Sequence, residues 1–497
     1  MTERNLLLVI DEGTTSTRAI CFDRDFREVA VAQQALSLTY PNDGWVEQEG
    51  TEIWQATLAV SREVIEAAGG VERFAGIGIT NQRETTLVWD RATGVPIAPA
   101  IVWQDRRTAE LCGRLREEGL EPDVQSRTGL LLDPYFSATK IAWILDNTPG
   151  ARERAAAGEL AFGTVDSFLI WHLTGGQVHA TDVSNASRTL LYTLGVDGDG
   201  DWDPRLCEML NVPMSLLPDV LPSAGEYGES DAACFGAAIP IVSSVGDQQG
   251  ALVGQGCLEP GMAKITFGTG AFLVANTGRK KPVSENRLLG TVGYEAMGTS
   301  AMALEGSIFN AGTVIKWLRD ELGMVQSAEE TEQLARSVEG NAGVYLVPAF
   351  TGLGAPHWDS EARGAISGLT RASSRGHIVR AGLEAAAYQT HDLLNAFAAD
   401  GVRIEDLRVD GGMVANDWLM QFLADVCDVP VLRPAYLEMT ALGAAALAAM
   451  TLGWLTPKDW ASRAVDGTRF TPNMPDATRK ALLNGWESAL KRIKTTA

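Results

Sequence analysis

The chain has 497 residues, enough for two large or three ordinary domains, and its 45% hydrophobic and 21% charged residues exclude wholesale disorder and a collagen-like repeat. Its 63 acidic residues outnumber its 41 basic ones, and the resulting net charge of −22 disfavours a function on nucleic acid or on anionic membrane surfaces. Six scattered cysteines without a C-x-x-C pair, together with only five histidines, predict no disulfide framework and no zinc site, but a cytoplasmic protein with reduced thiols.

The first predicted elements form a β-hairpin. An apolar strand at Leu6–Ile10 leads into the turn-forming residues Gly13–Thr15, and the apolar residues Ala19–Phe22 follow as the second strand. Short strands then alternate with helical patterns, which favours an α/β architecture. The further predicted elements of this half are strands at Ala75–Thr80 and Thr85–Trp89 and helices at Glu52–Ala67 and Ser137–Leu145.

The order strand, Gly/Thr turn, strand recurs in the second half, at Ile265–Phe267, Gly268–Gly270 and Ala271–Ala275. We interpret the recurrence as a duplicated architecture with domains at residues 1–255 and 256–497, because residues 250–262 are rich in glycine and proline. A chance repeat of one hairpin is the alternative. The stretch Met439–Leu455 is interrupted by Thr and Gly and rich in Ala, so it is predicted as a close-packed buried helix and not as a membrane span.

Three Gly-rich turns have the composition of phosphate-binding loops. The turn in Asp11–Arg18 combines a carboxylate that can hold Mg²⁺ through water with hydroxyls and an Arg that can donate to phosphate oxygens. Gly268–Gly270 and Asp410–Asn416 are the other two, and no Walker sequence occurs in the chain. Each turn alone is equally compatible with an ordinary tight turn. Together they favour a nucleotide held in a cleft between the two halves.

Two polar clusters suggest a second ligand. Arg83 and Glu84 place a cation beside an anion after a strand, a pair that can hydrogen-bond neighbouring hydroxyls of a polyol. Asp247 lies between glycines, where it can act as a general base in phosphoryl transfer or simply cap a helix. The aromatic residues Trp103 and Tyr135 lie in charged turns and are compatible with a ligand wall or with packing alone.

Seven blocks of this sequence resemble the FGGY carbohydrate kinases, in order, over residues 5–456. The blocks lie at residues 11–20, 78–86, 101–108, 133–140, 246–249, 350–356 and 410–416. Those at 78–86 and 101–108 resemble the glycerol kinases within this family, whereas the Gly-Thr turns are shared by all its members.

The resemblance implies the actin-like ATPase fold, with two ribonuclease-H-like domains around an interdomain cleft. It also implies ATP-dependent phosphorylation of glycerol to sn-glycerol 3-phosphate with Mg²⁺, the first step of glycerol catabolism. The implied partners are glycerol and ATP or ADP, with no nucleic acid and no membrane insertion, in a homodimer or homotetramer. One alternative is a sibling FGGY kinase for another polyol or a ketose. A less favoured one is an actin-like or chaperone-like ATPase.

The family's site residues carry over by position. Asp247 would be the general base, and Asp11 would organise Mg²⁺ through water. The residues implied in glycerol binding are Arg83, Glu84, Trp103, Tyr135, Asp247, Gln248 and Phe272. Those implied in nucleotide binding are Thr14, Thr15, Ser16, Arg18, Thr269, Gly312, Lys316, Gly412 and Asn416, of which Lys316 occupies a position that varies in the family.

The sequence departs from the family at two places. Glu12 stands where many members have Gln, which adds a negative charge beside the first turn. Residues 230–238 match the loop that ends in Arg in members inhibited by fructose bisphosphate, but here they contain neither Arg nor His. We therefore expect neither that inhibition nor the activation by phosphohistidine that some bacterial relatives show.

Overall fold

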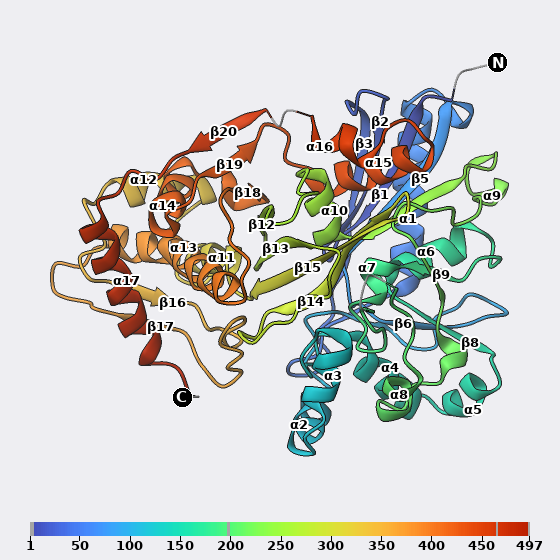
Figure 1. Cartoon of the computed structure of the whole chain (residues 1–497), viewed down its shortest axis with the longest axis horizontal. Helices are drawn as coiled ribbons and strands as arrows, with labels where there is room; N and C mark the ends of the chain where they lie inside the picture. Colours follow the sequence, from blue (N-terminus) through green and yellow to red (C-terminus); the bar gives the residue numbers. More distant parts are fainter. Residues whose placement is uncertain (1–3, 196–198, 464–465, 496–497) are drawn as a thin grey trace.

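The computed structural model describes residues 4–195, 199–463 and 466–495, and two β-sheets form its framework (Figure 1). Within these ranges, one sheet has five strands in the order β11-β5-β1-β2-β3, and the other has seven in the order β14-β15-β13-β12-β18-β19-β20. The first half of the chain builds the five-stranded sheet and the second half builds the seven-stranded one. The division of the chain at residue 255 into two domains stays a proposal.

Both sheets contain the predicted strand–turn–strand unit. In the first, β1 pairs antiparallel with β2 and parallel with β5. In the second, β12 pairs antiparallel with β13 and parallel with β18. The strands of the first sheet are β1 (Leu6–Glu12), β2 (Ser16–Phe22), β3 (Glu28–Ala35), β5 (Phe74–Asn81) and β11 (Ile241–Gly246). The strands of the second are β12 (Ala263–Phe267), β13 (Ala271–Gly278), β14 (Leu289–Ala296), β15 (Thr299–Ile308), β18 (Leu407–Asp410), β19 (Val431–Pro434) and β20 (Gly467–Phe470).

Short strand pairs and helices complete both halves. The pairs are β4 (Glu47–Gln48) with β7 (Ala100–Ile101), β6 (Leu87–Asp90) with β8 (Leu160–Gly163), β9 (Ala180–Asp182) with β10 (Asp219–Leu221), and β16 (Tyr345–Val347) with β17 (Ala365–Ser367). The helices of the first half are α1 (Gly50–Ala67), α2 (Ala109–Glu117), α3 (Glu121–Thr128), α4 (Ser137–Asn147), α5 (Ala151–Ala156), α6 (Val165–Leu173), α7 (Val183–Ala186), α8 (Pro204–Met209), α9 (Ala232–Phe235) and α10 (Asp247–Gly254). Those of the second half are α11 (Gly312–Asp320), α12 (Ala328–Arg336), α13 (Arg375–Ala399), α14 (Asp417–Cys427), α15 (Met439–Thr451), α16 (Pro457–Ala461) and α17 (Asp476–Lys491).

Strand β1 is buried on both faces of the five-stranded sheet because it is apolar at every position from Leu6 to Ile10. Successive side chains of a strand point to opposite faces. Accordingly, Leu6, Leu8 and Ile10 of β1 pack in the core formed with α1, while Leu7 and Val9 pack in the core formed with α15. The continuous apolar run of β1 therefore marks a central strand of a sheet covered on both sides.

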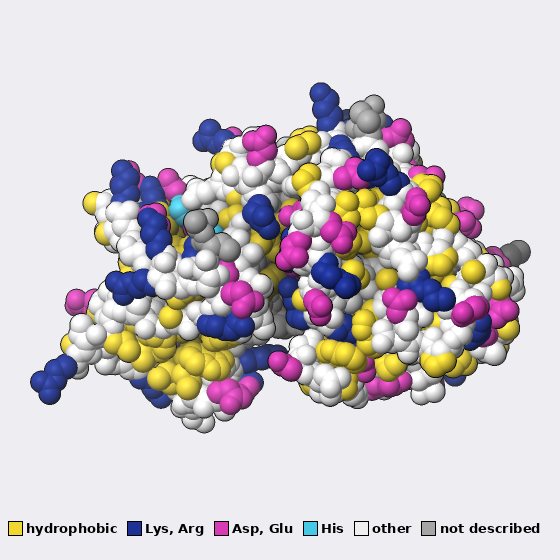
Figure 2. All heavy atoms as spheres, turned by 90° about the horizontal axis from the view of Figure 1, so that it is seen from below, with side chains coloured by type: hydrophobic (Ala, Val, Ile, Leu, Met, Phe, Trp, Pro, Cys, Tyr) yellow, Lys and Arg dark blue, Asp and Glu magenta, His cyan; other side chains and the backbone are white. Residues whose placement is uncertain are grey.

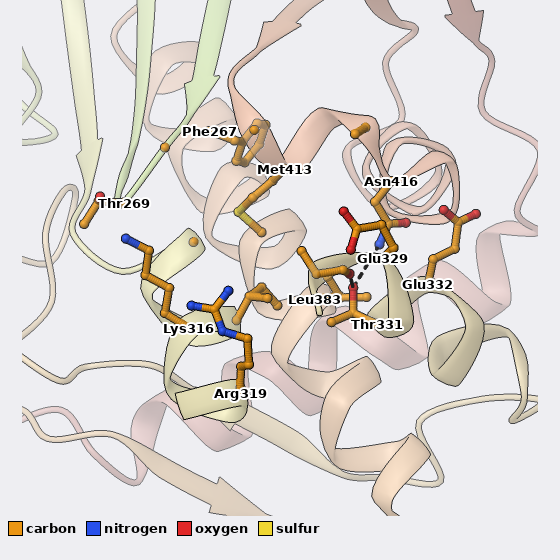
Figure 3. A pocket seen from close by; sticks show the side chains of 16 residues that line it. Phe267, Thr269, Lys316, Arg319, Glu329, Thr331, Glu332, Leu383, Met413 and Asn416 are labelled. Atoms are coloured by element: carbon orange, nitrogen blue, oxygen red, sulfur yellow. Dashed lines mark hydrogen bonds between the residues drawn. The ribbon is translucent and has the colours of Figure 1, made fainter. Parts of the chain in front are cut away.

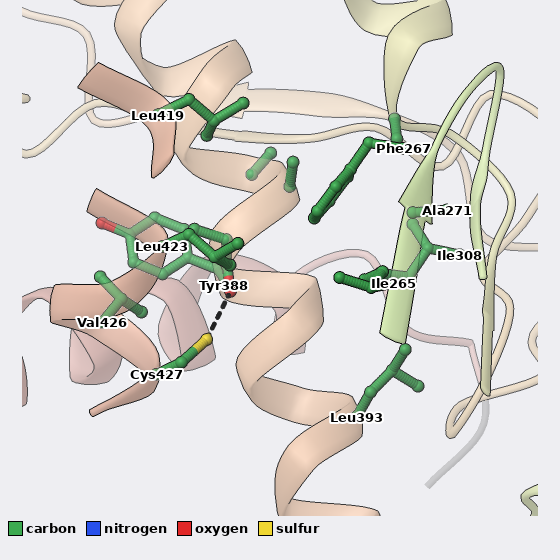
Figure 4. Close-up of a cluster of buried hydrophobic side chains, with 14 of the residues drawn as sticks. Ile265, Phe267, Ala271, Ile308, Tyr388, Leu393, Leu419, Leu423, Val426 and Cys427 are labelled. Atoms are coloured by element: carbon green, nitrogen blue, oxygen red, sulfur yellow. Dashed lines mark hydrogen bonds between the residues drawn. The ribbon is translucent and has the colours of Figure 1, made fainter. Parts of the chain in front are cut away.

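The seven-stranded sheet packs against α13 and α14. Ile265 and Phe267 of β12 face Leu393 of α13 and Leu423 of α14 across this core (Figure 4). All of these side chains are at most 1% exposed. Since β12 leads directly into the second Gly-Thr turn, this packing fixes where that turn begins.

The two halves are joined by α15, which lies between β19 and β20 of the second sheet in the chain but packs on β1, β5 and β11 of the first (Figure 1). It crosses α10 at glycines: a Cβ on Gly443 would overlap the carbonyl oxygen of Gly250, and one on Gly254 would overlap that of Met439. The two helix backbones therefore touch. The second sheet is thus built from residues 256–497. Helix α15 lies in the same range of the chain but packs on the sheet of the first half.

The other predicted elements agree closely with the structure. The helices predicted from Glu52 and Ser137 are α1 and α4, and the Ala-rich stretch from Met439 is the buried helix α15. The strand predicted from Thr85 begins only at Leu87, because the chain turns at the preceding residues. Within the described ranges, no helix is both long and apolar enough to span a membrane.

Candidate active site

The turn after β1 is closed by its own backbone and tied to an aromatic residue. Gly13 N donates to the carbonyl of Ser16 at 3.0 Å, and the Thr14 hydroxyl accepts from Trp103 Nε1 at 2.9 Å. The next residue, Thr15, is exposed. The Ser16 hydroxyl accepts from a side chain on β3. Two of the four predicted phosphate contacts of this turn, Thr14 and Ser16, thus already accept a hydrogen bond within the first half.

Asp11 lies next to the last residue of β1, beside other charged groups. Burial raises the pKa of its carboxyl to about 7; Arg18 counteracts this effect, and Glu438 and Asp247 reinforce it. The Arg18 guanidinium itself forms an ion pair with Glu438, just before α15. Asp11 and Asp247 therefore lie close enough to repel each other, and a cation between them would relieve that repulsion.

Glu12 faces away from the phosphate turn. Its side chain is 0% exposed and accepts from the Thr57 hydroxyl of α1 at 3.2 Å. Burial raises the pKa of this carboxyl to about 8, so it is mostly protonated at neutral pH. The extra negative charge predicted beside the turn is thus both turned inward and largely neutralised.

Glu84 has an unusual backbone conformation that α4 stabilises. Its φ is 60°, in the left-handed region that residues other than glycine seldom adopt. Its carbonyl accepts from the Ser137 hydroxyl at 3.3 Å and from Lys140 Nζ at 3.2 Å. Lys140 also donates to the carbonyl of Tyr135 at 2.7 Å, and burial lowers the pKa of its ammonium to about 7. The first turn of α4 thus fixes both Glu84 and Tyr135.

The Arg83 guanidinium lies at the centre of a buried network. Its Nε is 3.2 Å from Asp247 Oδ1, and its Nη1 is 2.5 Å from Glu305 Oε2. Its terminal nitrogens also donate to the Tyr135 hydroxyl and to Gln249 Oε1, each at 3.3 Å. Arg83 is only 3% exposed. The network therefore fixes the plane of the guanidinium.

Arg188 extends this network to Glu84. Its Nε donates to Glu84 Oε1 at 2.6 Å, and its Nη2 donates to Glu305 Oε1 at 2.8 Å. The side chains of Arg188, Glu84 and Glu305 are at most 1% exposed. The pKa of Glu305 is lowered to about 2, because the two guanidinium groups outweigh the effect of burial. Its carboxylate is therefore ionised at neutral pH.

Three aromatic rings border the network. Trp103 meets Tyr135 and Phe272 edge to face, with ring centres 5.7 and 5.9 Å apart. The Arg83 guanidinium lies 5.9 Å from the centre of the Phe272 ring. Trp103 and Phe272 are half-buried. An apolar wall thus stands beside the charged groups, an arrangement that suits a small molecule with a carbon skeleton and several hydroxyls.

Asp247 and Gln248 begin α10, directly after β11. The backbone N–H of Gln248 donates to Asp247 Oδ1 at 2.7 Å, and the Asp247 side chain is 31% exposed. The Gln248 side chain accepts from Lys264 Nζ at 2.5 Å. Lys264 is 0% exposed, and burial lowers the pKa of its ammonium to about 8. Asp247 therefore combines a fixed orientation with partial exposure.

A pocket of about 400 Å³ lies in the second half, between the turn after β12 and helices α11 and α12 (Figure 3). Five predicted nucleotide-binding residues line it, namely Thr269, Gly312, Lys316, Gly412 and Asn416. The Lys316 side chain points toward Thr269, and Asn416 Nδ2 lies 3.4 Å from Thr331 Oγ1. A Cβ on Gly312 would lie 2.5 Å from the carbonyl oxygen of Gly268, so only glycine permits this close approach.

The predicted residues thus form two groups. The predicted glycerol contacts surround Arg83, while the predicted adenosine contacts line the pocket. Thr14 joins the first group through Trp103, and neither Thr15, Ser16 nor Arg18 lines the pocket.

Sequence reasoning missed Arg188, Glu305 and Lys264. A signal was present for two of them, because Lys264 and Glu305 are isolated charges inside the apolar strands β12 and β15. Arg188 gave no comparable signal.

Comparison with known proteins places the whole chain in one family. The N-terminal domain of the FGGY family of carbohydrate kinases matches residues 6–254, and the C-terminal domain of that family matches residues 263–452. A glycerol kinase of Rhodospirillum centenum is 56% identical over 499 residues, which cover 100% of both proteins. A glycerol kinase of Ectopseudomonas mendocina is 55% identical over 493 residues, covering 98% of this chain and 99% of that protein.

A solved structure extends the similarity to the fold. The glycerol kinase of Plasmodium falciparum with ADP superposes with a TM-score of 0.91 and 34% identity, covering 100% of this chain and 99% of that chain. The prediction of an α/β protein with the actin-like ATPase fold is confirmed by this match. Because both family domains match in order and together cover most of its length, the chain belongs to the FGGY family of carbohydrate kinases.

Proposed function

We propose that this kinase transfers the terminal phosphoryl group of ATP to glycerol, forming sn-glycerol 3-phosphate and ADP. The observation that carries the proposal is the buried Arg83 guanidinium, fixed beside Asp247 and the aromatic ring of Phe272. The full-length relatives named glycerol kinase, at 55% and 56% identity, support the same substrate. We therefore propose glycerol as the phosphoryl acceptor of this member of the family.

We call the proposed polyol contacts Arg83, Glu84, Trp103, Tyr135, Asp247, Gln248 and Phe272 the clamp. This clamp selects a small polyol. Arg83 donates hydrogen bonds to one hydroxyl, and Glu84 and Asp247 accept from others, while Trp103 and Phe272 pack on the carbon skeleton. Tyr135 and Gln248 supply further polar contacts. An acceptor that lacks one hydroxyl would leave a buried charge without a partner, at a cost of about 1–3 kcal/mol. Selectivity therefore comes from satisfying each polar group.

Asp247 is the general base. Its carboxylate takes the proton of the attacking hydroxyl, whose oxygen bonds to the γ-phosphorus as the bond to the bridging oxygen breaks and ADP leaves. The contacts from Arg83 Nε at 3.2 Å and from the Gln248 N–H at 2.7 Å engage Oδ1. The other carboxylate oxygen is thereby left to face the substrate.

The nucleotide occupies the pocket of the second half, with adenosine against Gly412 and Asn416 and with Thr269, Gly312 and Lys316 on the phosphate side. On the first half, Thr14, Thr15, Ser16 and Arg18 are the proposed phosphate contacts. The Ser16 hydroxyl accepts from Gln33 and can still donate its own hydrogen, whereas Arg18 must first exchange its present partner, Glu438. Phosphate oxygens suit both groups, since hydroxyls and guanidinium groups donate to them.

Mg²⁺ fits beside Asp11, because the pKa of this carboxyl is raised to about 7 by burial and neighbouring carboxylates, and a cation there would favour its ionised form. Within the described part of the chain, no cluster of three or more His, Cys, Asp or Glu side chains could hold a metal alone. A cation shared between Asp11 and the nucleotide agrees with that finding. When bound, Mg²⁺ neutralises charge on the transferred phosphoryl group.

The setting proposed for this reaction is the cytoplasm. The cysteines are all free and buried, which suits a reducing compartment. The homodimer or homotetramer expected from the family stays a prediction.

The deciding experiment measures ADP release with glycerol, erythritol and xylulose as acceptors. Glycerol is expected to give the highest kcat/KM, and Asp247→Asn is expected to lower kcat by ~10²–10⁴-fold while ADP still binds. The exposed Asp43→Asn is the matched control and should behave as wild type. Turnover of another acceptor without turnover of glycerol would refute the substrate, and normal turnover by Asp247→Asn would refute the base.

A further inference from the structure

Glu305 connects the two sheets at the substrate clamp. It lies on β15 of the seven-stranded sheet, yet its carboxylate contacts Arg83, which follows β5 of the five-stranded sheet. Oε2 is 2.5 Å from Arg83 Nη1, and Oε1 accepts from Arg83 Nη2 at 3.3 Å. Glu305 therefore binds both terminal nitrogens of the guanidinium, the two-pronged geometry that fixes a guanidinium plane.

The same carboxylate is connected to Glu84, another residue of the clamp, through Arg188. Its Oε1 accepts from Arg188 Nη2 at 2.8 Å, and Arg188 Nε donates to Glu84 Oε1 at 2.6 Å. Charges thus alternate along the chain of contacts Asp247, Arg83, Glu305, Arg188 and Glu84. Its two ends are proposed substrate contacts, and Glu305 stands in the middle.

The Arg83 guanidinium contacts two carboxylates, and Glu305 determines which of its nitrogens face each of them. Glu305 is 0% exposed and takes the terminal nitrogens, whereas Asp247 at 31% exposure takes only Nε. Without the charge of Glu305, the guanidinium would turn toward Asp247, because a buried cation needs a close anion. The terminal nitrogens of Arg83 would then bind the carboxylate of the proposed base, Asp247. The guanidinium would also lose the orientation in which it donates to a substrate hydroxyl.

We propose that Glu305 is a positioning residue, which sets Arg83 directly and Glu84 through Arg188 and so makes polyol binding depend on the placement of the second sheet. This inference rests on the proposed function of the clamp. Because Glu305 belongs to the sheet that also carries the turn Gly268–Gly270, the two substrate sites share a rigid element. Movement of that sheet then changes both sites together.

The test compares Glu305→Gln and Glu305→Asp with wild type in steady-state kinetics and ADP binding. Glu305→Gln is expected to raise KM for the polyol by roughly 10- to 100-fold, while KM for ATP and the Kd for ADP stay within about threefold. Glu305→Asp retains the charge and should recover part of the loss. A purely structural role would change the constants for both substrates together or change neither.

Glu384→Gln is the matched control. Glu384 is equally buried in the second half, where it accepts from Arg380 Nε at 2.7 Å and from the Tyr388 hydroxyl at 2.9 Å, away from the clamp. This variant is expected to lower the thermal unfolding midpoint but to leave KM for the polyol unchanged. An equal rise of that KM in Glu384→Gln would overturn the proposal.

A second variant covers the case in which Glu305→Gln fails to fold. Glu305→Gln combined with Arg188→Gln removes one charge of each sign and so keeps the net charge of the network as in wild type. KM for the polyol should stay at least tenfold raised in this double variant even though it folds. A folded single or double variant with KM for the polyol within threefold of wild type overturns the positioning role. All constants are measured with whichever polyol wild type phosphorylates, so failure with glycerol itself contradicts only the proposed substrate.

Discussion

The side chain of Glu12 shows how burial alone alters the chemistry of a residue. Its pKa rises from 4.5 to about 8 in the folded protein. The folded chain therefore holds this proton more tightly than the unfolded chain does between these two values. Stability contributed by the protonated carboxyl is present at low pH and is lost as the pH rises through that window.

Glu12→Gln is accordingly expected to stabilise the protein at alkaline pH. Gln has the same shape but no charge to bury, so the variant should exceed wild type in the free energy of unfolding by ~4–5 kcal/mol at about pH 9 and by no more than ~1 kcal/mol at about pH 5. Thermal unfolding at both pH values measures the difference.

The exposed Glu63→Gln, on the same helix that contacts Glu12, is the control and should show no such pH dependence. A Glu12→Gln variant that is equally or less stable than wild type at alkaline pH would contradict the burial argument.

Individual site residues were predictable to the extent that short sequence blocks encode them. Arg83 and Glu84 are adjacent in the chain, so a local pattern reveals the pair. Glu305 and Arg188 reach the same network from 222 and 104 residues away, through sheet packing that no local pattern specifies. The direction of the Glu12 side chain likewise depends on the packing of α1 against β1, which no local pattern specifies.

At the scale of elements, the crossing of α10 and α15 depends on glycine. A Cβ on Gly443 would overlap the carbonyl oxygen of Gly250, so Gly443→Ala must push the two helices apart. We expect a net destabilisation of ~1–3 kcal/mol in spite of the better helix propensity of alanine. Because Asp247 begins α10, kcat should fall as well. Chemical unfolding and steady-state kinetics measure the two effects.

Gly113→Ala in α2 is the matched control for this substitution. No atom lies within 4 Å of a Cβ placed there, so alanine should stabilise the protein by up to ~1 kcal/mol. The two substitutions are thus expected to change stability in opposite directions. Equal effects would show that the helices do not touch as described.

Elements with a strong local pattern were predictable, and their contacts were not. The hairpins were predicted because apolar runs flank Gly-Thr turns, and α15 was predicted as buried because its stretch is rich in alanine. The start of β6 was predicted two residues early, since Thr85 follows the left-handed Glu84 and Thr86 pairs with Ile101 as an isolated bridge. Strand propensity is overridden at the left-handed residue.

At the scale of the whole molecule, the net charge of −22 makes local cations decisive for anionic ligands. On the face seen in Figure 2, basic and acidic side chains are interspersed over both lobes. The pocket proposed for the nucleotide is lined by Lys316 and Arg319 as well as by Glu329 and Glu332, and Lys264 lies buried near Asp247. An anion for which the protein offers no such pocket is repelled by the net negative charge of the molecule.

The segment 230–238 offers no such pocket, and from this we predict that fructose 1,6-bisphosphate does not inhibit the enzyme. The segment carries Asp231 and no Lys, Arg or His. The neighbouring Arg62 donates to the carbonyls of Cys234 at 2.7 Å and Ala233 at 3.1 Å, so its guanidinium is already engaged. Four phosphate charges would therefore meet a carboxylate instead of a cation. In the ADP-release assay, the bisphosphate should lower kcat/KM no more than inorganic sulfate does at the same ionic strength, whereas saturable inhibition beyond the sulfate effect would reveal a site elsewhere on the molecule.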